Sequence, residues 1–283
     1  MPGERIFQIF YDEQTRSLLD PDFEPLDNSD NERPDWFEYW PMRRFLRGAS
    51  LRDASHYGFL SPNFQAKTQL TGRQVKAFVD RHREADVITF SPYPCHAASF
   101  LNVFEQAEFT QPGFMHVASA YLRHIGSAVS LQTTVNHSGN SVFSNFFLAK
   151  PVFWRHWDAA AERLFRAAES DSGAMGTMLN QETPYMRDDG LAKRAQMKVF
   201  LMERFVTLLL STMPEFAVAN YPPFDLPLTS YFLPLRNEVM RLDELKIAYA
   251  RSGDEALLRA YRTLQEQTLD AASRNQRRAL LAK

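Results

Sequence analysis

Tyr11 and Asp12 end a short run of β-branched and aromatic residues, Ile6–Tyr11, whose composition predicts a buried strand. In open α/β sheets, ligands bind beyond the carboxyl ends of the strands, so residues at these ends are the first candidates for chemistry. The ring of Tyr11 could stack on a nucleobase, and the carboxylate of Asp12 could hold a ribose hydroxyl or a ring N–H. A solvated aspartate beside a half-buried tyrosine explains the pair equally well.

Ser61, Asn63 and Lys67 follow a second predicted strand, Tyr57–Leu60. A hydroxyl and an amide followed by a cation could hold a pyrophosphate, and the ammonium would offset the charge that builds on a leaving group. Taken alone, Lys67 is more often a surface lysine.

Glu105 and Glu108 lie three residues apart, which places both carboxylates on one face of a predicted helix. A carboxylate can act as the general base that deprotonates an attacking hydroxyl, so both are catalytic candidates. An exposed acidic turn explains either residue singly at least as well.

Three further candidates lie in apolar surroundings. Asn145 stands among phenylalanines, where an amide needs hydrogen-bond partners, and a bond to a neighbouring loop is the commoner explanation. Glu203 and Arg204 are adjacent opposite charges within an otherwise apolar stretch, where charges must be paired. We expect them to form a buried ion pair that anchors loops, in preference to direct ligand contact.

Several familiar motifs are absent from the sequence. It has no G-x-G-x-x-G, no Walker loop, no G-x-S-x-G elbow and no H-E-x-x-H, and its seven histidines lack the spacing of metal ligands. Asp188 and Asp189 are its only adjacent aspartates and give little support for a metal. The single Cys95 cannot form an intramolecular disulfide. We therefore assign no residue to a metal.

The composition is that of an ordinary globular protein: 283 residues, 45% hydrophobic and 23% charged, with a net charge of -2. Such a chain forms one large domain or two small ones, and its charge argues against nucleic acid as a main partner. No signal peptide opens it, and no apolar run approaches the roughly 20 residues of a membrane helix. The expectation is a soluble cytoplasmic protein.

Predicted strands and helices alternate over the first ninety residues, which is typical of an α/β sheet with right-handed crossovers. Residues 12–36 are expected to form a long irregular loop, and the chain from Arg236 onward is expected to be helical, with a joint at 252–254. The remaining predicted elements are helices at 36–48, 71–85, 95–108, 112–126, 151–170 and 195–213, and strands at 86–90, 142–150 and 216–221.

Six strings of the sequence together resemble bacterial GT-A-type glycosyltransferases of capsule and O-antigen clusters. The resemblance covers roughly residues 6–225 in order and implies an α/β fold, a GT-A-like (Rossmann-like) mixed sheet flanked by helices. It divides the chain into a domain at 1–235 and a C-terminal helical extension at 236–283. The strings are F-Q-I-F-Y-D, F-E-Y-W-P-M-R-R-F, Y-G-F-L-S-P-N-F-Q-A-K-T, D-V-I-T-F-S-P, S-N-F-F-L-A-K-P-V-F-W and V-F-L-M-E-R-F.

The resemblance implies transfer of a sugar from a nucleotide-sugar donor, with UDP-sugars favoured, to a polysaccharide or a lipid-linked glycan. A carboxylate would be the base if the reaction inverts the anomeric centre, and the protein would work in the cytoplasm, at the inner face of the membrane. By position, the donor-site residues would be Tyr11 and Asp12 at the nucleotide, Ser61, Asn63 and Lys67 near the phosphates, Asn145 in the N-x-F-x-x-K element, and Glu203 and Arg204 bracing or lining the pocket.

One departure from the family is the missing Asp-x-Asp, which usually holds a divalent metal on the diphosphate. Either Lys67 or an arginine neutralises the diphosphate without a metal, or the chain has lost catalysis; we favour the first. Two rival functions follow. One is a non-catalytic module that binds a nucleotide-sugar or a glycan, and the other is an assembly protein of a polysaccharide-export complex that docks through residues 236–283.

Overall fold

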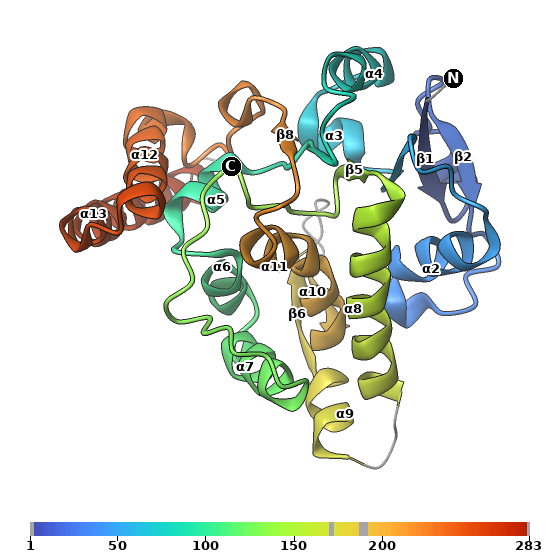
Figure 1. Ribbon diagram of the computed structural model, residues 1–283. Helices are drawn as coiled ribbons and strands as arrows, with labels where there is room; N and C mark the ends of the chain where they lie inside the picture. Colours follow the sequence, from blue (N-terminus) through green and yellow to red (C-terminus); the bar gives the residue numbers. More distant parts are fainter. Residues whose placement is uncertain (1–2, 170–172, 187–191, 282–283) are drawn as a thin grey trace.

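The computed structural model describes residues 3–169, 173–186 and 192–281. In this part of the chain a six-stranded mixed sheet is flanked by helices, and a two-stranded hairpin stands apart from it (Figure 1). The predicted mixed α/β architecture is therefore confirmed. Across the sheet the strands are β2 (Glu24–Asp27), β1 (Glu4–Phe10), β3 (His56–Leu60), β5 (Phe147–Ala149), β4 (Val87–Thr89) and β8 (Val218–Asn220).

One strand of the large sheet, β5, runs opposite to its two neighbours, β3 and β4. The other pairings, β1 with β2, β1 with β3 and β4 with β8, are parallel. The amino end of β5 therefore lies beside the carboxyl ends of β3 and β4. This arrangement brings the loop before β5 to the edge of the sheet where ligands bind in α/β proteins.

The two faces of the sheet belong to two different hydrophobic clusters, because successive side chains of a strand point to opposite faces. Phe7 of β1 and Phe59 of β3 lie in the larger cluster, whereas Ile6 and Leu60 lie in the smaller one. The larger cluster includes residues of α2 (Tyr39–Gly48), α6 (Val103–Thr110), α7 (Phe114–His124), α8 (Pro151–Glu169), α10 (Met197–Glu203) and α11 (Phe205–Thr212), and the smaller one residues of α3 (Phe64–Thr68) and α4 (Gly72–Arg81).

Several predicted helix boundaries are confirmed. Thr71 caps α4 through a capping box with Gln74, and Pro151 begins α8 directly after β5. Two predicted helices are each broken in two. Residues 95–108 contain α5 (Pro94–Ser99) and α6, because Asn102 accepts the first N–H groups of α6 and starts a new helix. The stretch 195–213 contains α10 and α11, with the break at Arg204.

Residues 12–36 are more regular than predicted. They contain α1 (Glu13–Arg16), the edge strand β2 and a 3-10 turn, η1 (Pro34–Trp36). The edge strand β2 has only four residues, includes Pro25 and has no fully buried side chain, so the sequence carries little signal for it. The predicted strand at 142–150 is shorter, with only β5 in the sheet.

Between α8 and α10 lie a short helix, α9 (Ala174–Leu179), and the hairpin formed by β6 (Glu182–Met186) and β7 (Ala192–Gln196), which the sequence did not predict. Asp188 and Asp189 fall outside the described residues.

The C-terminal residues form α12 (Arg236–Ser252) and α13 (Glu255–Leu281), as predicted, after the 3-10 turns η2 (Pro223–Asp225) and η3 (Leu233–Leu235). Gly253 makes the joint with a φ of 68°, which glycine adopts without strain. Both helices pack beside α5 (Figure 1), and they share a hydrophobic cluster with it that includes Ala98, Val239 and Tyr261. Among the described helices, none combines the length and the apolar character needed to span a bilayer.

Candidate functional site

The carboxyl edge of the large sheet gathers residues from three distant parts of the chain. Tyr11 follows β1, Ser61 follows β3, and Asn145 precedes the antiparallel β5. The backbone N–H of Phe90, just after β4, donates to the carbonyl of Phe146 at 2.8 Å and holds the loop before β5 at this edge.

Two hollows open at this edge, and they share the residues Phe37, Glu38 and Tyr185. The inner chamber, of about 50 Å³, also contains Asn145 and Glu203 in its lining. The outer cavity, of about 380 Å³, also contains Tyr11, Asp12, Asn63, Lys193 and Arg194 in its lining. Because the two hollows share a wall, a ligand in the outer cavity could extend one end into the inner chamber.

Glu38 is the central acidic group of the site. It stands at the start of α2, half-buried, with its exposed part facing the two hollows. Burial raises the pKa of its carboxyl, and the negative charge of Glu203 raises it further, whereas the positive charge of Lys67 lowers it. The charges of Glu203 and Lys67 therefore both act on Glu38, in opposite directions.

Lys67 reaches the site from α3. Its Nζ donates to the Ser144 hydroxyl oxygen at 3.3 Å, and Ser144 lines the inner chamber. The ammonium also lies 6.0 Å from the ring centroids of both Tyr93 and Phe146. These contacts hold a positive charge behind Ser144, next to the inner chamber.

Oδ1 of Asn145, which lines the inner chamber, is buried and has no hydrogen-bond partner among the described residues, whereas the buried hydroxyl of Tyr11 lies within reach of the carboxylate of Glu38. Burial raises the pKa of Tyr11 well above its usual value, and the nearby carboxylate of Glu38 adds to the rise. Buried polar groups are almost always hydrogen-bonded, so the unpaired amide oxygen of Asn145 beside the hollow suits a polar ligand.

Glu203 and Arg204 form the ion pair that the sequence predicted, with Nη1 of Arg204 2.9 Å from Oε2 of Glu203. Arg204 is 5% exposed and also binds the carbonyl of Phe200 and the side chain of Gln106. It lies behind the chamber, and only Glu203 of the two lines it. Arg204 therefore braces Glu203 from the protein side.

Backbone strain is concentrated around the same edge. Six described residues other than glycine have positive φ, a region that costs most L-residues free energy. All six line the inner chamber, the outer cavity or a third hollow beyond Lys67: Asn31, Phe37, Gln69, Tyr93, Ser144 and Asn145. Strain of this kind gathers at functional sites, because the surrounding structure must be built to hold it.

Asp12 and Asn63 lie at the rim of the outer cavity. The carboxylate of Asp12 accepts the backbone N–H of Thr15 at 2.7 Å and caps α1, and this bond lowers its pKa. Asn63 is exposed at the start of α3. A ligand that enters the outer cavity would therefore pass both residues, and Asp12 also caps α1.

Glu105 and Glu108 share α6 but do not reach either hollow. Glu105 accepts the backbone N–H of Leu101 at 2.7 Å and pairs with Arg262 of α13 at 3.0 Å. Glu108 accepts the N–H groups of Gly113 and Met115 and so holds the start of α7. The structure thus corrects their expected position beside the donor: both carboxylates are committed to joining helices.

Glu38 is the residue that sequence reasoning missed. A signal was present, because Glu38 is a single acidic residue inside the aromatic run W-F-E-Y-W. A carboxylate in such apolar surroundings is unusual and is therefore a candidate for a functional role. Ser144 and Tyr185 gave no such signal. Ser144 was hidden in a segment interpreted as strand, and Tyr185 belongs to a hairpin that was not predicted.

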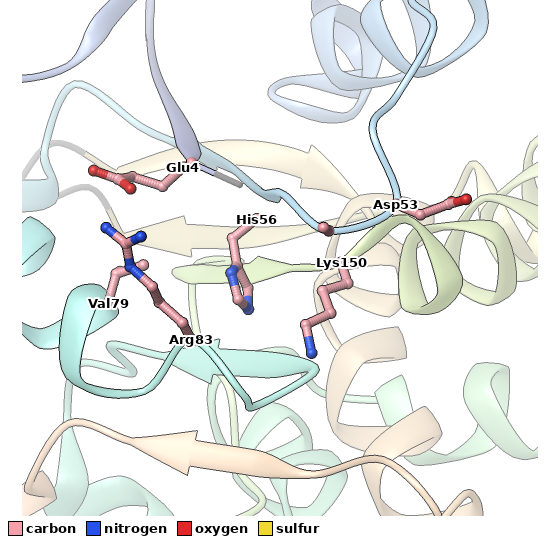
Figure 2. A pocket seen from close by; sticks show the side chains of 8 residues that line it. Glu4, Asp53, His56, Val79, Arg83 and Lys150 are labelled. Carbon is pink, nitrogen blue, oxygen red and sulfur yellow. The ribbon is translucent and has the colours of Figure 1, made fainter. Parts of the chain in front are cut away.

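A larger hollow, of about 410 Å³, lies at the opposite edge of the sheet, at the amino ends of β1 and β3. Figure 2 shows Glu4, His56, Arg83 and Lys150 around it. The polar groups there have structural partners: Lys150 donates to the carbonyl of Glu84 at 2.7 Å, and the ring of His56 pairs with the carbonyl of Ala85 at 2.8 Å. The hollow at the carboxyl edge is therefore the stronger candidate.

Comparisons with known proteins leave the site to be interpreted from its own geometry. No family model matches the sequence, and searches of curated proteins and of solved structures find no match. Within the described residues, no group of three or more His, Cys, Asp or Glu side chains is arranged to hold a metal ion.

Proposed function

We propose that this protein transfers a sugar from a nucleotide-sugar donor to a hydroxyl of a glycan acceptor. The observation that carries the proposal is the inner chamber at the carboxyl edge of the sheet: the carboxylates of Glu38 and Glu203 line it, and the ammonium of Lys67 lies next to it on Ser144 and acts on the charge of Glu38. A mixed sheet flanked by helices, with a site at this edge, is also what the resemblance to GT-A-type glycosyltransferases implies.

The two hollows suit the two parts of such a donor. The nucleotide would occupy the outer cavity, with its base against Tyr11 and its phosphates beside Lys193 and Arg194, and the phosphate nearest the inner chamber would point toward Lys67, which lies outside the cavity lining on Ser144. The sugar would extend into the inner chamber, where its hydroxyls could donate to the unpaired Oδ1 of Asn145 and to the carboxylates. Lys67 would stabilise the diphosphate as it departs, in the place of a metal held by an Asp-x-Asp.

Glu38 takes the catalytic role that the sequence assigned to Glu105 or Glu108. A general base works best when its pKa lies near the working pH, and burial moves the pKa of Glu38 upward from its usual value. In an inverting transfer, Glu38 would accept the proton of the acceptor hydroxyl while that oxygen forms a bond to the anomeric carbon. The bond from the anomeric carbon to the diphosphate breaks in the same step, and the nucleoside diphosphate leaves with the electron pair.

The proposed setting is the one the family resemblance implies: a UDP-sugar as the favoured donor, a polysaccharide or lipid-linked acceptor, and a cytoplasmic protein that meets the acceptor at the inner face of the membrane. Nucleic acid has no part in this proposal, because the chain carries a net charge of only -2.

The experiment measures donor binding and turnover together. The melting temperature is recorded with a panel of UDP-, GDP- and dTDP-sugars, and release of the nucleoside diphosphate is followed with mixed glycan acceptors. We expect one donor class to raise the melting temperature and to be consumed. Absence of any shift and of any release across the panel would contradict the proposal.

Lys67→Ala tests the proposed contact with the diphosphate. Loss of its positive charge is expected to lower kcat/KM by about 100-fold, corresponding to roughly 2.7 kcal/mol of lost transition-state stabilisation. Lys67→Arg keeps the charge and should recover part of the activity. The matched control is Lys76→Ala on α4, whose side chain is 37% exposed and pairs at the surface with Asp22; it should leave kcat/KM unchanged.

A binding module without turnover is the second candidate, favoured by the missing Asp-x-Asp. Such a protein would show the thermal shift with a nucleotide-sugar but release no nucleoside diphosphate, and Lys67→Ala would weaken the affinity alone. The same two measurements therefore separate the enzyme from the binder.

A further inference from the structure

A third hollow lies beyond Lys67 and is separate from the two proposed to hold the donor. Its volume is about 240 Å³, and among the residues that the structure describes Lys67 is the charged one in its lining. Lys67 forms part of its wall and also binds Ser144 of the inner chamber at 3.3 Å. The hollow is therefore next to the proposed reaction centre. Its other principal lining residues are Gln69, Tyr93, Pro227, Leu228 and Thr229.

The shape of this hollow depends on two residues in left-handed backbone conformations. Gln69 follows α3 with φ 59° and ψ 18°, and Tyr93 precedes α5 with φ 61° and ψ 52°. Neither is a glycine, so both conformations cost free energy that the surrounding structure must supply. The ring of Tyr93 stacks on His96 with centroids 5.6 Å apart, which fixes the orientation of the ring.

The chemistry of the lining suits a sugar ring. Tyr93, Pro227 and Leu228 offer apolar surface for the C–H face of a pyranose. Gln69 and Thr229 offer an amide and a hydroxyl, which can exchange hydrogen bonds with sugar hydroxyls. A mostly apolar hollow with a few placed polar groups is the usual form of a small-molecule site.

We propose that this third hollow binds the acceptor, specifically the sugar unit that carries the attacking hydroxyl. The inference rests on the proposed function, because it assigns the second substrate of the same transfer. With the donor on one side of Lys67 and the acceptor on the other, the attacking hydroxyl would meet the anomeric carbon at the chamber wall.

The first test measures binding of free sugars without any donor. Saturation-transfer NMR is recorded on the full chain with methyl glycosides of glucose, galactose, mannose and N-acetylglucosamine at millimolar concentration. We expect saturation of ring protons of at least one glycoside. Leu228→Trp fills the hollow and should reduce that signal by about 10-fold, whereas Val152→Trp, at a residue 37% exposed on α8, adds the same bulk elsewhere and should not.

Two results would overturn the inference. One is the absence of saturation for all four glycosides, and the other is a signal that Leu228→Trp leaves unchanged. Both variants are first checked for an unaltered circular dichroism spectrum and melting temperature, because a misfolded variant would lose the signal for another reason. If Leu228→Trp fails this check, Thr229→Val, which removes one hydroxyl at the same volume, replaces it.

The second test separates stacking from hydrogen bonding at Tyr93. Tyr93→Phe keeps the ring and should leave the acceptor KM within about twofold. Tyr93→Leu removes the aromatic face and should raise the acceptor KM by about 10-fold, in line with a stacking contribution of roughly 1.4 kcal/mol. The dissociation constant of the donor should not change in either variant, and a change in donor affinity with an unchanged acceptor KM would contradict the assignment.

The failure of this inference differs from the failure of the proposed function. Glycoside binding at the hollow without any nucleotide-sugar binding would overturn sugar transfer from such a donor. If the donor binds and is consumed, but neither Leu228→Trp nor Tyr93→Leu changes the acceptor KM, the protein transfers a sugar and the acceptor binds elsewhere.

Discussion

At the scale of single residues, the site is defined by charges that face one another in a partly closed space. Glu38 faces the negative charge of Glu203 and the positive charge of Lys67, and burial raises the pKa of its carboxyl. An acid whose pKa is higher in the folded protein than in the unfolded chain holds its proton more tightly when folded. Its contribution to stability is therefore complete at low pH and is lost as the pH rises through the folded pKa.

Glu38→Gln should accordingly stabilise the protein at neutral and alkaline pH while it removes the proposed general base. We expect the variant to melt at about the wild-type temperature at pH 4 and roughly 2 °C higher at pH 8. Transfer should fall by about 100-fold or more. Thermal melts across this pH range and nucleotide release measure the two effects.

The matched control is Glu266→Gln on the exposed surface of α13, which should alter neither quantity. A Glu38→Gln variant that melts below the wild type at pH 8 would show that ionised Glu38 is stabilising, and full activity would exclude it as the base.

At the scale of elements, the insertion of β5 between β3 and β4 determines how closely side chains approach within the sheet. Gly58 of β3 pairs with Leu148 of β5, and a Cβ at position 58 would lie 2.6 Å from Cγ of Leu148. Glycine is therefore required here for a close approach. Because Asn145 lies just before β5, the packing of this pair also supports the loop at the inner chamber.

Gly58→Ala should destabilise the protein by about 1–3 kcal/mol, since the side chain of Leu148 must leave its position. Gly48→Ala is the control: Gly48 ends α2 with no atom within 4 Å of an added Cβ, so this change should be neutral or stabilising by about 0.5 kcal/mol. Urea denaturation of both variants compares the two glycines, and equal stability would contradict the close-approach argument.

At the scale of the whole molecule, the C-terminal helices are joined to the rest by a buried lysine. Lys246 of α12 is fully buried, and its Nζ donates to the carbonyls of Ala97 and Phe100 at the end of α5. Burial lowers the pKa of Lys246 to about 7. In the unfolded chain this lysine still binds its proton at pH 9, so the stability it contributes increases above pH 7 and is lost as the pH falls through 7.

Lys246→Met should remove this pH dependence. We expect the free energy of unfolding of the wild type, relative to the variant, to increase between pH 7 and 9 by up to about 1.4 kcal/mol per pH unit. Chemical denaturation of both proteins at pH 6, 7, 8 and 9 measures the difference. Lys76→Met, at a partly exposed surface lysine, should show no such trend, and a difference independent of pH would contradict a lowered pKa of Lys246.

The sequence by itself determined most of the elements, because their signals are local. The buried run before Tyr11 predicted β1, Thr71 predicted the start of α4, and Gly253 marked the joint between α12 and α13. The edge strand β2 was not predicted because it has only four residues, contains a proline and has no fully buried side chain. The helix breaks at Asn102 and Arg204 were not predicted, because the apolar periodicity of the sequence continues across them.

Only the tertiary structure decided which polar residues meet. Tyr11 and Lys67, 56 positions apart, both act on Glu38, a residue that periodicity could not single out. Glu105 and Glu108 looked equally suited to catalysis, yet Glu105 binds the N–H of Leu101 before its own helix and Arg262 of α13, and Glu108 binds the N–H of Gly113 at the start of α7. The physical reason is that strand and helix formation depend on neighbours along the chain, whereas a site depends on where the ends of strands are brought together by a sheet whose order differs from the order of the sequence.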